Sequence, residues 1–280
     1  MRPLRSCGIV VLAGLCLVAC TSSAGPGQPG GTQAELEGAT LWLPESTVDD
    51  DGPVSRSHSF SPWHVLVSQP DKSQLVYTDK FHVDVDEWTS TGANPFFILE
   101  PGFELVLSGK EDDEEETVTI LVTDETRKIG GVEARVVTET ETRGGKLVEI
   151  SRNYFAMSMK TNSVYYFGED VDDYKDGKVV SHDGAWLAGE KGARWGMIMP
   201  GTHLLGSRYY QEIAPEVAMD RAETVNLAEK CETPGGKFEN CLVTHESSPM
   251  EKGSSIKVYA RGIGLIADGA LRLVRHGKKK

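Results

Sequence analysis

Two cysteines near the C-terminal end of the chain could form a disulfide bond. Cys231 and Cys241 flank the segment CETPGGKFENC, whose glycines predict a tight hairpin turn. If that turn is a three-residue loop, strand parity places Cys231 directly opposite Cys241, which suits a disulfide in an oxidising compartment. Cysteine catalysis would need a histidine base, and His245 follows Cys241 at about 13 Å along an extended strand, out of hydrogen-bond reach.

An acidic segment that ends in a glycine, residues 170–177, could coordinate calcium through its carboxylates. The candidate ligands are Glu169, Asp170, Asp172 and Asp176. Counted from Asp172, the twelfth position is Gly184, where a calcium loop has a bidentate glutamate. A turn rich in aspartate and glycine explains the same residues. We therefore expect no cofactor, with calcium as the alternative.

The chain lacks the short motifs that define common active sites. No two of the seven histidines have the helical i,i+4 spacing of a zinc protease, and there is no G-x-S-x-G elbow, phosphate loop or dinucleotide fingerprint. We therefore expect a non-enzymatic protein without catalytic residues. The alternative is a hydrolase with a dispersed active site, for which the loop 169–176 and His182 are the first candidates.

Aromatic residues in the expected strands provide the candidates for ligand binding. They are Tyr154, Tyr166, Trp186 and Tyr259. Aromatic side chains in a β protein usually build the core, but a curved sheet that fails to close leaves an apolar groove between them. We expect a protein that binds a lipid or another apolar or amphipathic ligand, in a groove beside Tyr166 and Trp186, or that binds an envelope protein partner. The alternative is a structural or interaction module with a filled core and an exposed apolar patch.

The N-terminus has the features of an export signal. Arg2 and Arg5 precede an apolar run that ends at Cys20 and is too short to span about 30 Å of hydrocarbon. The sequence Leu-Val-Ala-Cys at 17–20 resembles the lipobox of bacterial lipoproteins, which implies that Cys20 is lipidated and becomes the mature N-terminus. The alternative is an ordinary signal peptide that ends at a cysteine. Several acyl chains, such as palmitate, would anchor the protein to the cell membrane or to an outer membrane.

Composition divides the chain into four segments. Residues 1–19 form the signal, 20–39 the lipidated cysteine and a flexible tether rich in glycine, proline and serine, 40–93 an N-terminal β elaboration, and 94–280 the main β domain. Removing Arg2 and Arg5 leaves 27 basic against 42 acidic residues, a formal charge of −15. So acidic a protein is not expected to bind nucleic acid.

The main domain is expected to be mainly β, a curved antiparallel sheet or half barrel. Its centre is the segment 152–178, two alternating strands around a turn at 160–163. Two strand–loop–strand units of similar length, 131–156 and 236–260, indicate a possible internal duplication. Residues 215–225 (PEVAMDRAETV) predict one short helix, since Pro215 suits a first helical turn.

From Asn94 onward, about two-thirds of the chain resembles a family of uncharacterised exported bacterial proteins. The shared segments include NPFF at 94–97, YFGED at 166–170, YKDGKVV at 174–180, FENC at 238–241 and YARGIGL at 259–265. The chain departs from the family at 156–158, which read Ala-Met-Ser where a polar Ala-Gln-Asp is expected. The resemblance implies a β-rich cell-envelope protein without an assigned reaction. The last motif also resembles that of periplasmic open-barrel lipoprotein carriers.

Overall fold

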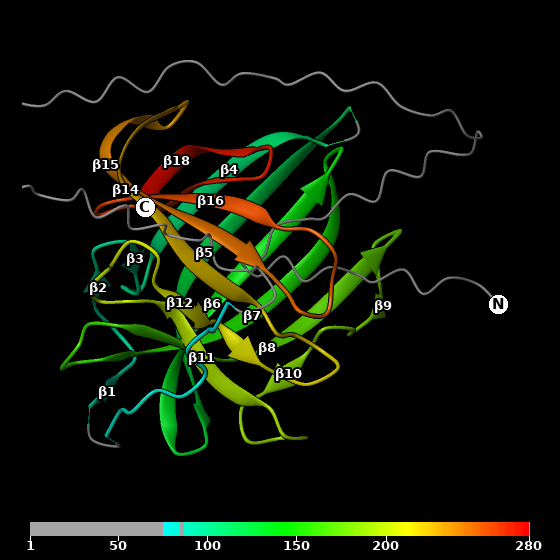
Figure 1. Cartoon of the computed structure of the whole chain (residues 1–280). Coiled ribbons are helices and arrows are strands. Elements are labelled where there is room, and N and C mark those ends of the chain that lie inside the picture. The colour runs from blue at the N-terminus through cyan, green and yellow to red at the C-terminus, as the bar shows by residue number, and fades with distance from the viewer. Residues whose placement is uncertain (1–74, 85–86, 112, 280) are drawn as a thin grey trace, which may run out of the picture. The chain divides into compact units, whose positions relative to one another are not determined.

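The computed structural model describes residues 75–84, 87–111 and 113–279 (Figure 1). The predicted signal peptide, Cys20, the tether and most of the 40–93 segment lie outside these residues. The described part of that segment includes β1 (Trp88–Thr89), which pairs with β7 (Lys146–Ser158), and Thr78, which forms an isolated bridge with Tyr209. Within the described residues, no helix has the length and apolar character needed to cross a membrane.

The described residues form strands and turns. The other strands up to the middle of the chain are β2 (Ala93–Asn94), β3 (Phe97–Ile98), β4 (Phe103–Glu111), β5 (Glu114–Ile129), β6 (Val132–Arg143), β8 (Val164–Lys175) and β9 (Lys178–Ser181). The later strands are β10 (Trp186–Leu187), β11 (Arg194–Met199), β12 (Arg208–Tyr210), β13 (Glu212–Ile213), β14 (Arg221–Thr233), β15 (Gly236–Ser247), β16 (Ser255–Ala260), β17 (Gly264–Asp268) and β18 (Leu271–Lys278). The prediction of a mainly β protein is confirmed.

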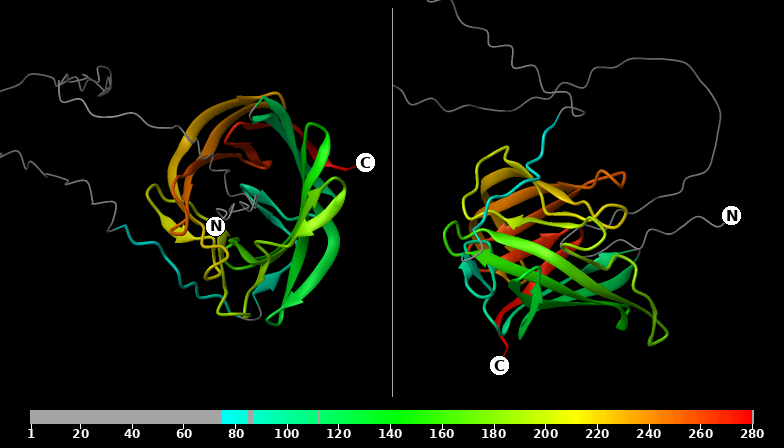
Figure 2. Two further views of the ribbon diagram at one scale, coloured as in Figure 1. Left: turned by 90° about the vertical axis from the view of Figure 1, so that its right-hand side faces the viewer. Right: turned by 90° about the horizontal axis from the view of Figure 1, so that it is seen from below.

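One large antiparallel sheet curves until its two ends nearly meet. Its order is β12-β14-β15-β16-β17-β18-β4-β5-β6-β7-β8-β11-β13, while β2 and β3 form a separate pair. Strands β12 and β13 are consecutive in the chain and are separated only by Gln211, so one bent segment pairs with β14 on one side and β11 on the other. Figure 2 shows β4–β8 and β14–β18 facing each other across a common interior.

Strand alternation determines which side chains enter this interior. Leu105 of β4 lies opposite Ile120 of β5, and Leu107 opposite Val118, so apolar side chains fill the part of the interior next to these strands. The predicted central hairpin is present as β7 and β8, and its turn includes Asn162 at φ 59°. Asparagine tolerates this left-handed conformation better than most residues.

The predicted helix at 215–225 is wrong. Residues 215–218 form a tight turn closed by a backbone hydrogen bond from Ala218 to Ala214, and Arg221 begins strand β14. Ala222 and Thr224 are buried and lie opposite Glu246 and Thr244 of β15. Pairing with β15 along most of β14 outweighs the weak helical preference of a short segment, because tertiary contacts override local propensity.

The two units suggested as a duplication occupy similar positions in the sheet. Strands β6 and β7 form an antiparallel pair followed by β8, and β15 and β16 form one followed by β17. In each unit, the pairing between the second and third strands shifts register. The shift falls just before Phe155 of β7 in the first unit and just before Tyr259 of β16 in the second. The units therefore share strand pairing and an irregularity, while a common origin stays a prediction.

Candidate functional site

The interior of the sheet contains a set of buried carboxyl groups. The inward positions of the strands supply Glu139 from β6, Glu149 from β7, Glu169 from β8, Glu212 from β13, Glu246 from β15 and Asp268 from β17. Each of these residues is at most 7% exposed. Carboxylates are seldom buried without partners, because desolvation penalises the charged form. Their concentration on one face of the sheet marks this interior as the candidate site.

Lys257 of β16 brings a positive charge to this interior. Its ammonium nitrogen lies 3.3 Å from Glu246 Oε2 and 3.4 Å from Asp268 Oδ2. Burial lowers the pKa of Lys257, but the charges of Asp268 and Glu246 outweigh burial and hold it above its ordinary value. Burial raises the pKa of Glu246 to about 7 even though Lys257 opposes the shift. Lysine and its two carboxyl groups thus form a fully buried ion cluster.

Three further carboxyl groups have no ion-pair partner among the described residues: Glu139, Glu149 and Glu169. Burial, followed by the charge of Glu149, raises the pKa of both Glu139 and Glu169 well above the ordinary range. Burial and the nearby Glu141 raise the pKa of Glu149 to about 8. These groups therefore hold protons at neutral pH unless a positive charge arrives.

Glu169 is the most isolated of these groups. The residue is completely buried, and neither carboxyl oxygen has a hydrogen-bond partner in the described part of the chain. Tyr166 lies beside it, but its hydroxyl donates to Asn153 Oδ1 at 2.7 Å and has no second hydrogen to offer. The indole nitrogen of Trp186, opposite Glu169 in the β8–β10 pair, is also buried without a partner.

A row of aromatic rings runs through the interior beside these carboxyl groups. The ring centroids of Phe97 and Phe155 are 5.0 Å apart, those of Phe155 and Tyr166 4.9 Å, and those of Tyr166 and Trp186 5.1 Å. The Phe155–Tyr166 pair is stacked and the other two pairs meet edge to face. The row connects two cavities, one at each end.

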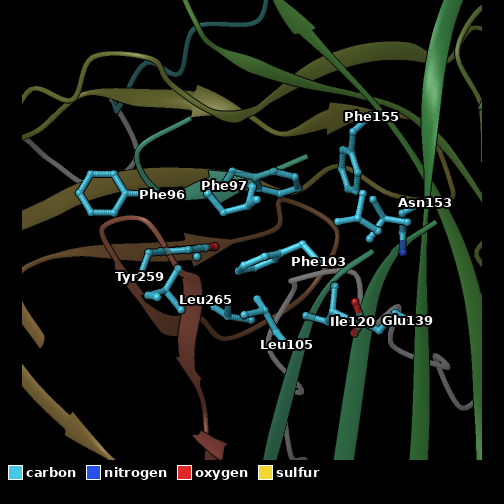
Figure 3. Close-up of a pocket in the computed structure, with 15 residues that line it drawn as sticks. Phe96, Phe97, Phe103, Leu105, Ile120, Glu139, Asn153, Phe155, Tyr259 and Leu265 are labelled. Atoms are coloured by element: carbon cyan, nitrogen blue, oxygen red, sulfur yellow. The ribbon is translucent and has the colours of Figure 1, made fainter. Parts of the chain in front are cut away.

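The first cavity, which we call the phenylalanine cavity, has a volume of about 40 Å³. Figure 3 shows side chains from separate strands that converge on it, including Phe97, Phe103, Leu105 and Phe155. Glu139 and Asn153 provide its polar wall. At this volume it holds only a few water-sized molecules, so its lining side chains must move before anything larger can enter.

The second cavity, which we call the rim cavity, has a volume of about 590 Å³. It lies between β10 with the loop that follows it and the turn after β13. Its apolar lining comprises Trp186, Leu187, Ala193, Ala214, Pro215 and Val217, and its charged lining Asp170, Glu190, Lys191 and Glu216. Pockets of about 300–1,000 Å³ hold small molecules. Trp186 therefore has a ligand-sized cavity on one side and Tyr166 on the other.

The predicted aromatic ligand-binding residues occupy two faces of the sheet. Tyr166 and Tyr259 are buried in the interior, and Trp186 packs against Tyr166. Tyr154 instead belongs to the outer face, where its hydroxyl donates to Asp170 Oδ2 at 2.7 Å and Arg127 lies 4.7 Å from its ring centre. Alternation along β7 accounts for the difference, because Tyr154 is adjacent to the inward Phe155.

The four calcium candidates do not come together. Glu169 is on the inner face of β8, whereas Asp170 and Asp172 are on the outer face in ion pairs with Arg127 and Arg152 at 2.7 and 3.0 Å. Asp176 lies in the turn between β8 and β9 with φ 52°. Among the described residues, no three acidic, histidine or cysteine side chains are arranged to hold a metal ion. Calcium binding stays a prediction that this arrangement does not favour.

The two cysteines are close, but their predicted register is wrong. Bulges in the β14–β15 pair place Cys231 opposite Phe238 and Cys241 opposite Glu229. Both are free thiols, Cys241 buried and Cys231 half-buried. Burial, followed by a hydrogen bond with the Cys231 thiol, raises the pKa of Cys241 to about 12. The thiols therefore touch diagonally across the hairpin rather than directly.

Sequence reasoning missed the interior carboxyl groups and Lys257. A usable signal was present in β6, where Val137, Glu139 and Glu141 share one face of a strand whose apolar residues point into the core. In a sheet with one face in water, the same alternation of polar and apolar residues is expected, with the polar residues on the outer face. Only closure of the sheet turns this face into a buried one.

No protein-family model matches this chain, and no curated protein matches it. One similar solved structure is a candidate exported protein with a YmcC-like fold from Bacteroides fragilis NCTC 9343. It is 17% identical, covers 66% of this chain and 100% of its own, and has a TM-score of 0.33. A candidate lipoprotein from Parabacteroides distasonis ATCC 8503 is 11% identical, with 63% and 95% covered and a TM-score of 0.30. With TM-scores under 0.5, neither likeness establishes a function here.

Proposed function

We propose that this protein is a lipid-anchored envelope protein that binds an amphipathic small molecule in the interior of its curved sheet. The rim cavity is the observation that carries the proposal, because its volume of about 590 Å³ suits a small ligand. Its apolar side chains, such as Trp186 and Leu187, take the hydrocarbon part of the ligand. Catalysis is not required for this role.

The aromatic row extends the binding surface inward. Trp186 lines the rim cavity and contacts Tyr166, so the indole lies between the cavity and the aromatic row that leads to the buried carboxyl groups. Phe97, at the far end of the row, belongs to β3, which among the described strands pairs with β2 alone and lies outside the large sheet. Its displacement would enlarge the phenylalanine cavity without breaking the main strand ladder.

The location rests on the N-terminal sequence. A basic start, a short apolar run and Cys20 favour export followed by lipidation, and the anchor would hold the sheet at a membrane surface. The family resemblance from Asn94 onward points to the same compartment. Ligands with an apolar part are most abundant beside a membrane, so the predicted membrane location and the rim cavity support the same function.

Native mass spectrometry tests ligand binding. All described strand pairs of the large sheet join residues between Trp88 and Lys278, so a secreted chain that begins at residue 21 contains every one of these strands. We expect this chain, purified from the exported compartment, to carry an adduct with the mass of an amphiphile that denaturation removes. A chain that retains its fold and has no adduct would contradict the proposal.

A pair of tryptophan substitutions locates the site. Ala185 is exposed and lines the rim cavity, so Ala185→Trp should fill it and remove the adduct while thermal stability is kept. Ala228 is equally exposed but lies on β14 away from the cavity, so Ala228→Trp should keep the adduct. Equal adduct levels in both variants would place the ligand elsewhere.

A further inference from the structure

We infer that the amphiphile carries a positive charge, and that an organic ammonium group is held between Glu139 and Glu169 against the rings of Phe155 and Tyr166. This inference rests on the proposed function and names the chemical class of its ligand. It follows from unpaired buried acids, from the aromatic row, and from the position of Lys257.

The unpaired acids are the first argument. Glu169 is fully buried, and the neighbouring Tyr166 hydroxyl donates its hydrogen to Asn153 rather than to either Glu169 oxygen. Glu139, 5% exposed, lines the phenylalanine cavity without an ion-pair partner among the described residues. Glu139 lies opposite Ser151 of β7 and Glu169 lies opposite Asn153 of the same strand, so the two acids flank one stretch of β7, and the charge of Glu139 adds to the raised pKa of Glu169. A buried polar group without a partner is destabilising, and a cation with N–H donors would satisfy several oxygens at once.

The aromatic row favours an organic cation. Rings of Phe155 and Tyr166, stacked at 4.9 Å, lie beside the acids, and ammonium groups are attracted to aromatic faces. The described acids are not grouped as metal ligands. Trp186 continues the row from Tyr166 to the rim cavity, so a hydrocarbon chain can extend from the charged group along the row into that cavity once the indole moves aside.

Lys257 shows how the same interior accommodates a positive charge. Its ammonium nitrogen is within 3.4 Å of two carboxyl groups, Glu246 and Asp268, and stays charged although fully buried. No described lysine or arginine lies within ion-pair distance of Glu139 or Glu169, although the charge of Lys257 partly opposes the rise in the Glu139 pKa. A ligand ammonium at these two residues would reproduce the arrangement around Lys257 with a group that can leave.

Three ligands with the same eight-carbon chain test the charge. Calorimetric titration of the secreted chain from residue 21 with octylammonium, octan-1-ol and octanoate should give at least about tenfold tighter binding of octylammonium than of octanol, and the weakest binding for octanoate. Because the acids are protonated before binding, octylammonium should also release protons, seen as a buffer-dependent heat.

Paired substitutions assign the charge preference to named residues. Glu139→Gln combined with Glu169→Gln should reduce the preference to about twofold or less while octanol still binds. The control, Glu125→Gln with Glu239→Gln, removes two exposed carboxyl groups and should keep the preference. The calorimetric series and the proton release on the unmodified chain test the charge even if the double variant fails to fold.

The outcomes separate the two proposals. Equal binding of octanol and octylammonium would overturn the charge inference and leave amphiphile binding in place. Binding of none of the three would overturn both. A preference that survives in the interior double variant, or binding of octylammonium without proton release, would overturn the assignment to Glu139 and Glu169.

Discussion

Lys257 is a single residue that brings a positive charge into the acidic interior. Its ammonium is fully buried, yet two carboxyl groups within 3.4 Å keep it charged. Glu246 also accepts hydrogen bonds from Thr244 at 3.1 Å and from Gln211 at 3.3 Å, so the ion cluster is linked to the residue at which the sheet closes. A buried ion pair contributes little stability by itself, but loss of one partner is strongly destabilising.

The raised carboxyl pKa values predict that stability falls as pH rises. Glu149 of β7, which faces Glu141 of β6 and Asp173 of β8, has a pKa raised to about 8, and Glu246 one of about 7. Between about pH 4.5 and 8 the folded protein holds protons that the unfolded chain releases, so unfolding becomes more favourable with increasing pH. The urea midpoint should therefore be higher at about pH 5.5 than at about pH 8.

Substitution of Glu149 provides the control for this pH dependence. Glu149→Gln removes one proton-binding group and should flatten the change of the urea midpoint with pH, whereas the exposed Glu125→Gln should leave it unaltered. A midpoint that increases between about pH 5.5 and pH 8 would show that these acids are ionised in the folded protein.

The cysteine pair predicts a disulfide in the exported protein. The thiols of Cys231 and Cys241 are hydrogen-bonded diagonally across the hairpin, and an oxidising compartment favours a disulfide between them. Thiol titration of the denatured secreted chain from residue 21 should find no free thiol, and reduction should lower its stability by about 2–3 kcal/mol. Cys241→Ser should leave one titratable thiol. Two titratable thiols in the unmodified exported chain would disprove the bond.

At the scale of elements, closure of the sheet depends on a close backbone approach. A Cβ atom added at Gly196 of β11 would overlap the carbonyl oxygen of Gln211, the residue between β12 and β13. Gly196→Ala should therefore separate β11 from β13 and lower the free energy of unfolding by about 3 kcal/mol or more. Chemical denaturation with tryptophan fluorescence measures this change.

A second glycine serves as the reference. Gly130 has φ 57° in the β5–β6 turn, and a Cβ atom added there would meet no other atom within 4 Å. Because asparagine tolerates this left-handed conformation, Gly130→Asn should change stability by less than about 1 kcal/mol. Similar losses in both variants would mean that closure at Gln211 contributes no special constraint.

At the scale of the whole molecule, the N-terminal cysteine predicts a membrane anchor. Cys20→Ala should abolish incorporation of labelled palmitate and remove the mature protein from the membrane fraction. Cys16→Ala, which alters a cysteine inside the apolar run, should keep the label. Palmitate on the Cys20→Ala protein would contradict the lipobox interpretation.

Local sequence patterns predicted the main strands, the central hairpin and the curved antiparallel sheet, because alternation of apolar and polar residues and turn-forming glycines are local properties. They misplaced the helix at 215–225, where pairing of β14 with β15 outweighs local propensity. They also misjudged the cysteine register, since bulges are not visible in local patterns.

The burial of acidic residues in the interior follows from tertiary contacts and not from local sequence patterns. Tyr166 and Trp186 could be chosen from sequence as aromatic candidates, but the acids beside them could not, because Glu139 and Glu169 look like outward residues of an open sheet. Their burial follows from closure through Gln211, which brings β11 and β14 together from distant parts of the chain. Long-range pairing converts an alternating pattern into a buried, acidic interior.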